Sequence, residues 1–347
     1  MNKLLSVFVL TAFLIPAAAE AQLPGKLKRA AEKVLEGVDD KGGEATTAQA
    51  GTNQRPPAYA GENREYAPGL SFSTVLNGVV VLAKDGKFQL NQIQATFIPD
   101  DCTEGFVVLR TAEGKELFQY DWRPDRLKKP YTLLNFHNTT DLQTGEKSGG
   151  GWKVLEPGAY VLDFYLPTEH FYTFPFVVEK TGGNDPFGDG QCYVMKGMWE
   201  RWGYLYYSDA NPDRNLEWKV WLRNDACNEK DVNIQVEIVR DSDGELVCTS
   251  REHTTNSVQP QWTRLAFDMV FPKGKDVPHG TYFKAKDLLA TDGAYTLTMK
   301  SNGGPYGTWK FEIENGTPKS IGRTVRGVAD PLTFIEGGRD AFWYERQ

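Results

Sequence analysis

The stretch EPGAYVLDFYLPTEHFYTFPFVVEK, residues 156–180, returns 135 positions later as TDGAYTLTMKSNGGPYGTWKFEIEN, residues 291–315. The two stretches can be aligned without gaps, and the second keeps several residues of the first. A repeat of this length predicts that the chain contains one domain twice. The residues of the first copy that recur in the second are Gly158, Ala159, Tyr160, Leu162, Thr173, Phe176 and Glu179.

The similarity continues upstream in two further blocks. VVLRTAEGKEL, residues 107–117, aligns with EIVRDSDGELV, residues 237–247, so that Arg110 and Gly114 fall on Arg240 and Gly244. Residues 78–102 align with residues 203–227, and both blocks end in a cysteine. The offsets of the three blocks are 125, 130 and 135. Chance similarity between β-rich segments is the alternative, but the conserved order of the blocks favours a duplication with two insertions in the second copy.

Both copies have the pattern of β-strands. In VNIQVEIVR, apolar residues at 232, 234, 236 and 238 alternate with polar ones, which is the period of a strand with one buried face. The segments DSDG, AEG and KDG read as tight turns between strands, because Gly tolerates positive φ. Helical periodicity is lacking across both copies. The predicted fold class is therefore all-β, with two antiparallel sandwiches.

The segments LEPGAY and ATDGAY resemble the tyrosine corner of immunoglobulin-like and fibronectin type III-like domains. In that motif a Tyr near the start of a late strand hydrogen-bonds back across the preceding turn. The resemblance covers both copies, at residues 70–180 and 192–316, and the strand pair after each Tyr resembles the last hairpin of such sandwiches. Leu162 and Leu297 stand where antibody domains have a cysteine. The resemblance implies an architecture and leaves the activity open.

These patterns divide the chain into seven segments. Residues 1–21 read as a secretory signal peptide, 22–40 as an amphipathic helix and 41–69 as a flexible linker poor in large apolar residues. The helix would either mediate association or cover a sandwich edge. The first sandwich is expected at 70–181, an interdomain link at 182–191, the second sandwich at 192–316 and a C-terminal extension at 317–347.

The signal peptide predicts an exported protein of the periplasm, the cell surface or the extracellular medium. No later stretch approaches the roughly 20 apolar residues of a transmembrane helix. The net charge is -7 without a basic run, which argues against a nucleic-acid partner. The expected partner is instead a protein or a glycan of the cell envelope.

The 4 cysteines allow three disulfide pairings once the chain is exported. One possibility joins Cys102 to Cys227, and another pairs Cys227 with Cys192 or Cys248 inside the second sandwich. The resemblance to immunoglobulin-like domains places Cys192, just before the first strand, near the loop that holds Cys227. We therefore favour the pair Cys192 and Cys227.

Motifs of enzymes and metal sites are hard to find. The 4 histidines stand apart without a His-Glu-x-x-His pattern, and neither a Gly-x-Ser-x-Gly elbow nor a phosphate-binding Gly loop occurs. Asp209, Asn211 and Asp213 alternate as the ligands of calcium loops do, so calcium is the one cofactor that the sequence suggests. The Gly of the sharp turn is absent and Pro212 stiffens the loop, so we favour a polar hairpin turn and expect no cofactor.

Aromatic residues make up 12% of the chain, and MWERWGYLYY contains Trp199 and Trp202. Aromatic rings on a surface can stack on the apolar faces of sugars, so these two residues are the candidate ligand-binding residues. We expect an exported, non-enzymatic protein for binding, adhesion or envelope scaffolding. The alternatives are a carbohydrate-binding module that uses Trp199 and Trp202, and a glycan-acting enzyme whose carboxylates the sequence does not identify.

Overall fold

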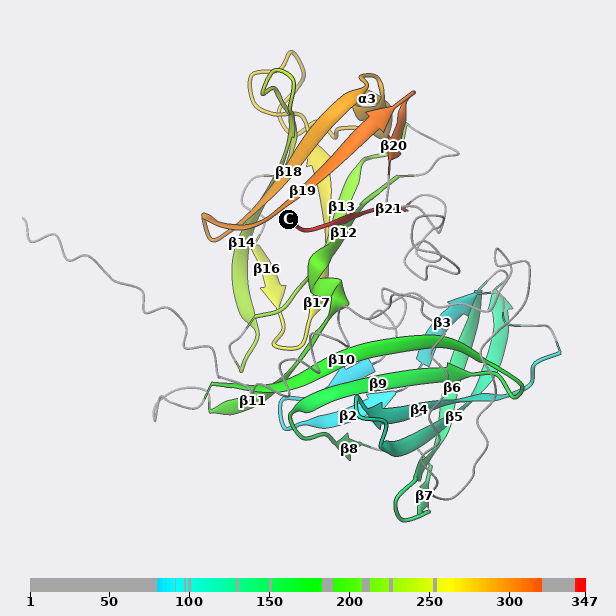
Figure 1. Cartoon of the computed structure of the whole chain (residues 1–347). Coiled ribbons are helices and arrows are strands. Elements are labelled where there is room, and N and C mark those ends of the chain that lie inside the picture. Colours follow the sequence, from blue (N-terminus) through cyan, green and yellow to red (C-terminus); the bar gives the residue numbers. More distant parts are fainter. Residues whose placement is uncertain are drawn as a thin grey trace, which may run out of the picture.

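The computed structural model describes residues 80–90, 92–96, 98, 101–128, 131–149, 152–182, 190–207, 213–224, 227–251, 255–319 and 341–347. The predicted signal peptide, amphipathic helix and linker lie outside these ranges. Within them the regular structure consists almost wholly of antiparallel strands, which confirms the predicted all-β class (Figure 1). No helix in this part of the chain is long and apolar enough to cross a membrane.

The first sandwich has two layers. The larger sheet has the order β11-β10-β9-β4-β5-β6-β3, with β7 paired to β6, and the smaller sheet has the order β1-β2-β8. The rings of Phe88 and Phe176 stack between the layers at 5.5 Å. The strands are β1 (Val80–Leu82), β2 (Lys87–Leu90), β3 (Gln92–Thr96), β4 (Gly105–Thr111), β5 (Glu116–Lys128), β6 (Tyr131–Asp141), β7 (Lys147–Ser148), β8 (Lys153–Val154), β9 (Gly158–Tyr165), β10 (His170–Gly182) and β11 (Gln191–Gly197).

The second sandwich is one long sheet folded over on itself. Its order is β20-β19-β18-β14-β15-β17-β13-β12-β21, with β16 paired to β14. The ring centres of Trp218 on β13 and Trp309 on β19 lie 5.1 Å apart, although the two strands are far apart in the order of the sheet. The two halves of the sheet therefore pack face to face. The elements are η1 (Met198–Arg201), β12 (Trp202–Tyr206), β13 (Glu217–Leu222), β14 (Lys230–Arg240), β15 (Leu246–Ser250), β16 (Thr255–Val258), β17 (Thr263–Val270), α3 (Ala285–Leu289), β18 (Gly293–Ser301), β19 (Gly304–Glu314), β20 (Thr317–Lys319) and β21 (Ala341–Glu345).

The two sandwiches share their strand order, as a duplication requires. The run β10-β9-β4-β5-β6-β3 of the first matches the run β19-β18-β14-β15-β17-β13 of the second. The hydroxyl of Tyr160 donates to the carbonyl of Glu156 at 2.7 Å, and the hydroxyl of Tyr295 donates to the carbonyl of Thr291 at 2.7 Å. Both predicted tyrosine corners are therefore present.

The strand register corrects one detail of the sequence alignment. Thr111 pairs with Tyr160 in the first copy, and Arg240 pairs with Tyr295 in the second. Arg240 is thus the counterpart of Thr111 and not of Arg110. The turn that follows is closed by Thr111 N–H on the carbonyl of Lys115 in one copy and by Arg240 N–H on that of Glu245 in the other. The second turn is therefore one residue longer.

Two strands lie elsewhere than the predicted segment boundaries imply. β11 pairs with β10 from Gly182 opposite Gln191 to Phe176 opposite Gly197, so residues 191–197 extend the first sheet. Residues 183–189 of the predicted link are outside the described residues. β21, from the predicted C-terminal extension, pairs with β12 of the second sandwich. Each sandwich thus gains a strand that the sequence repeat does not contain.

The two sandwiches meet in a common aromatic core. Trp199 of η1 stacks on Phe174 of the first sandwich, with ring centres 5.4 Å apart. Trp221 stacks on Trp343 in the same cluster. A Cβ on Gly197 would lie 1.9 Å from the Trp199 ring, so only glycine fits there. The two sandwiches are therefore held against each other by packed side chains.

Candidate functional site

The structure buries both aromatic residues that the sequence suggested for ligand binding. Trp199 is 0% exposed and Trp202 is 5% exposed. Trp199 lies between Phe174 and Trp262 at the junction of the sandwiches. The expectation that these two rings form a surface platform is wrong, because the turn at η1 directs Trp199 into the common core.

The exposed tryptophan is Trp152, which was not among the candidate residues predicted from the sequence. All nine Trp lie in the described residues, and Trp152 is 46% exposed. Val154, the last residue of the two-residue strand β8, is 56% exposed, and Trp152 directly precedes that strand. Lys153 between them lies over the Phe118 ring at 5.2 Å. The glycines at 149–151 directly before Trp152 were the available signal that this Trp is not a core residue.

Trp152 and Val154 belong to the edge of the smaller sheet. β8 is the outermost strand of the order β1-β2-β8 and pairs on one side with β2, where Val154 faces Lys87. Beneath it, Leu155 and Phe88 are fully buried and anchor this edge to the core. One exposed apolar side chain therefore lies on a short edge strand and a second lies directly before it, a feature that natural sheets usually protect and that suits contact with a partner.

Little of the suggested calcium loop can be described. Asp209 and Asn211 lie outside the described residues. Asp213 forms an ion pair with Lys286, which lowers the pKa of its carboxyl. Among the residues that the structure describes, no three His, Cys, Asp or Glu side chains are grouped so that they could hold a metal ion.

The predicted disulfide between Cys192 and Cys227 is confirmed, with Cα atoms 5.3 Å apart. Its place differs from the expected one. Cys192 lies on β11 of the first sheet, whereas Cys227 lies between β13 and β14 of the second sandwich. The disulfide therefore links the two sandwiches. Cys248 is a buried thiol whose pKa is raised by burial, and Cys102 is half-buried.

A buried carboxylate joins three strands of the first sheet. Asp163 of β9 is 6% exposed. Its Oδ2 lies 2.5 Å from Nε of Arg110 on β4, and its Oδ1 accepts a hydrogen bond of 2.8 Å from Thr173 on β10. His170 Nε2 lies 3.5 Å from the same Oδ1 and 3.0 Å from the Thr173 hydroxyl.

The surroundings of Asp163 keep it ionised. Burial raises the pKa of this carboxyl, but the hydrogen bond with His170 and the charge of Arg110 outweigh that effect and hold the pKa below its usual value. Both carboxylate oxygens are engaged, so Asp163 is poorly placed to take a proton from a substrate. The cluster therefore serves to hold β4, β9 and β10 together.

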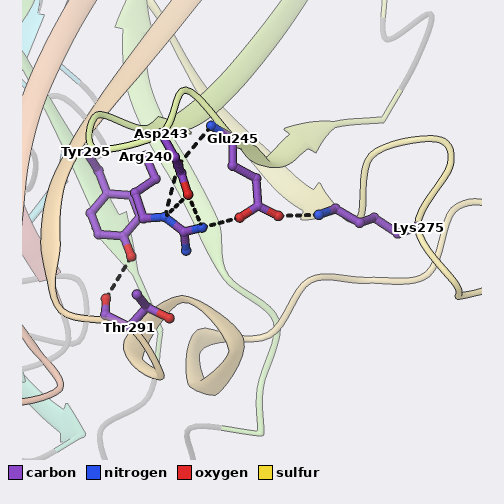
Figure 2. A network of polar contacts seen from close by, with 6 residues as sticks. All are labelled: Arg240, Asp243, Glu245, Lys275, Thr291 and Tyr295. Atoms are coloured by element: carbon purple, nitrogen blue, oxygen red, sulfur yellow. Dashed lines mark hydrogen bonds and ion pairs between the residues drawn. The ribbon is translucent and has the colours of Figure 1, made fainter.

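A second polar network surrounds the tyrosine corner of the second sandwich (Figure 2). Arg240 Nη2 donates to Asp243 Oδ2 at 2.7 Å and also bonds Glu245, and Glu245 in turn pairs with Lys275. Lys275 lies between β17 and α3, so the network joins the β14–β15 turn to a neighbouring loop. Solvent-exposed ion pairs of this kind contribute little to stability, and the network's main effect is to order two loops.

No protein-family model, curated protein or solved structure matches this chain.

Proposed function

We propose that the protein is an exported, non-enzymatic binding protein for adhesion or envelope scaffolding, built from two immunoglobulin-like sandwiches. The observation that carries the proposal is the apolar edge formed by Val154 on β8 and by Trp152 directly before that strand. Exposed apolar residues on a strand edge suit recognition of a partner surface. A protein or glycan of the cell envelope is the expected partner.

The immunoglobulin-like part of the proposal is supported by the strand order. In such folds strands A, B and E lie in one sheet and C, F and G in the other. The second sandwich has β12-β13-β17 and β14-β18-β19 in these places. Tyrosine corners at Tyr160 and Tyr295 add a second, independent likeness.

Export is supported by the disulfide. Disulfides persist in oxidising compartments and are rare in the cytosol. The bond between Cys192 and Cys227, together with the predicted signal peptide at 1–21, favours the periplasm, the cell surface or the medium. Because this bond and the aromatic core both cross the junction, the proposed protein holds its β8 edge on a rigid two-sandwich unit.

The proposal is tested with the chain lacking residues 1–21, sedimented with cell envelopes of the source organism. Replacing Trp152 and Val154 by Ser is expected to reduce the bound fraction at least tenfold. Val277→Ser is the matched control, because Val277 is another exposed apolar residue, far from β8 in the sequence. Equal binding by the double variant and the unchanged chain would refute the role of this edge.

Carbohydrate binding is the second candidate, and the half-exposed Trp152 ring favours it. Sedimentation with peptidoglycan and insoluble polysaccharides separates it from protein binding. Sugar stacking is expected to survive Trp152→Tyr, to be lost in Trp152→Ala and to be unaffected by Val154→Ser. A protein partner would be sensitive to both positions. Release of reducing sugar ends from these polysaccharides during the incubation would overturn the non-enzymatic assignment and support a glycan-acting enzyme.

A further inference from the structure

The C-terminal strand β21 fills a slot in the second sandwich. It pairs with β12 along five residues, from Trp202 opposite Glu345 to Tyr206 opposite Ala341. On its other side Arg346 forms a bridge with Trp309 of β19. Gln347 N–H donates to the carbonyl of Thr308 at 2.8 Å. The C-terminal segment therefore pairs with β12 on one side and with β19 on the other. Figure 1 draws β21 in dark red.

The side chains of β21 anchor it on both faces. The ring of Phe342 stacks on that of Tyr207, with ring centres 5.2 Å apart. The ring centre of Tyr344 lies 5.2 Å from that of Phe311 in the core of the second sandwich. Trp343 points the other way, into the common core of the two sandwiches, where it lies 4.4 Å from Tyr204. All three aromatic residues are buried. The short segment thus binds as a peptide does in β-augmentation, with main-chain pairing and alternate side chains in pockets.

We propose that this slot is a strand-acceptor site whose occupant in an assembly is the β21 strand of a second copy of the chain. Residues 320–340 separate β20 from β21 in the sequence. An extended segment of that length spans on the order of 70 Å, which is well beyond the roughly 30 Å of a small domain. The connection is long enough for β21 to reach the slot of a neighbouring molecule.

A second copy suits the slot better than a foreign strand does. A foreign strand would displace the chain's own β21 and leave its three buried aromatic residues without their packing partners. Reciprocal exchange between two copies preserves every contact of Phe342, Trp343 and Tyr344, so it has a low energetic cost. The inference is independent of the β8 edge, because β8 and β21 lie in different sandwiches.

The test uses two full-length variants in a Cys102→Ser background, one with Tyr206→Cys and the other with Ala341→Cys. These positions face each other in the register of β12 and β21. A mixed disulfide between two chains requires the strand of one molecule in the slot of another. After native incubation and mild oxidation, we expect a crosslinked dimer whose 206–341 linkage is verified by mass spectrometry.

Three controls make the outcome decisive. A single chain with both cysteines must crosslink internally, which shows that the variants fold with β21 in place. Val277→Cys mixed with Ala341→Cys reports random collision, and the 206–341 pair is expected to react at least tenfold faster. Trp343→Ser in the donor chain is expected to abolish the difference. If the internal crosslink forms while the mixed dimer stays at the collision rate, or forms only after denaturation, the proposal is overturned.

Discussion

Cys192 and Cys227 join the edge strand of one sandwich to an interstrand loop of the other, with their Cα atoms 5.3 Å apart. Both sulfurs are buried beside Val194 in a small cluster of their own. The disulfide therefore fixes the position of β11, the strand that leads out of the first sheet and into η1.

Cys192→Ser is expected to lower the free energy of unfolding by about 3–4 kcal/mol, because the bond closes a loop between residues 35 apart. Urea denaturation under non-reducing conditions measures the change. Cys102→Ser serves as the control, since Cys102 is a half-buried thiol outside the disulfide, and it should leave the midpoint nearly unchanged. An equal loss in both variants would contradict the assigned pairing.

Tyr160→Phe and Tyr295→Phe should each reduce stability by about 1–2 kcal/mol. Each change removes one hydroxyl that donates to a carbonyl at 2.7 Å, and so removes a partly buried hydrogen bond. Thermal unfolding of both single variants and of the double variant measures the effects, with Tyr282→Phe as the control. A loss of stability in only one of the two single variants would show that the two tyrosines are not equivalent.

Gly197→Ala is expected to destabilise the protein by at least about 3 kcal/mol or to prevent folding. The added Cβ would lie 1.9 Å from the Trp199 ring, which is itself stacked on Phe174 and has little room to move. Gly149→Ala is the matched control because nothing lies within 4 Å of its Cβ position. Tryptophan fluorescence and the urea midpoint report both changes, and a tolerated alanine at 197 would argue against the packed junction.

Asp163→Asn is expected to lower stability at pH 7 by about 2–4 kcal/mol, because it leaves the partly buried Arg110 without its partner. The folded-state pKa of Asp163 is lowered, so its contribution is present above the pKa of about 3.9 of an unfolded Asp. It is lost as the pH falls through the lower folded value. The stability of the variant should therefore depend less on pH in the acidic range.

Chemical denaturation at several pH values between about 2 and 7 measures the free energy of unfolding of the unchanged chain and of Asp163→Asn. This range includes the usual titration of aspartate. Asp243→Asn provides the comparison, since Asp243 also pairs with an arginine but on the solvent-exposed side of the second sandwich. We expect no measurable change from it. An equal effect of the two substitutions would show that burial does not strengthen the Asp163 cluster.

The sequence by itself determined the all-β fold class and the tyrosine corners. Both depend on local patterns: alternation of apolar residues, turn residues, and a Gly-Ala-Tyr triplet that occurs at 158–160 and 293–295. The preferred disulfide, Cys192 with Cys227, was also predicted. These features need only the identity and spacing of nearby residues, or a resemblance that such residues carry.

Only the tertiary structure decided which residues are available at the surface. Trp199 lies in an aromatic stretch that suggested a surface platform, but it is stacked in the junction, whereas Trp152 lies at a sheet edge. The strand 191–197 likewise reads as the start of the second domain and yet pairs with the first sheet. The physical reason is that a strand's period of two does not determine which strand it pairs with or which layer covers each of its faces. The pairing partner and the covering layer are set by residues far away along the chain.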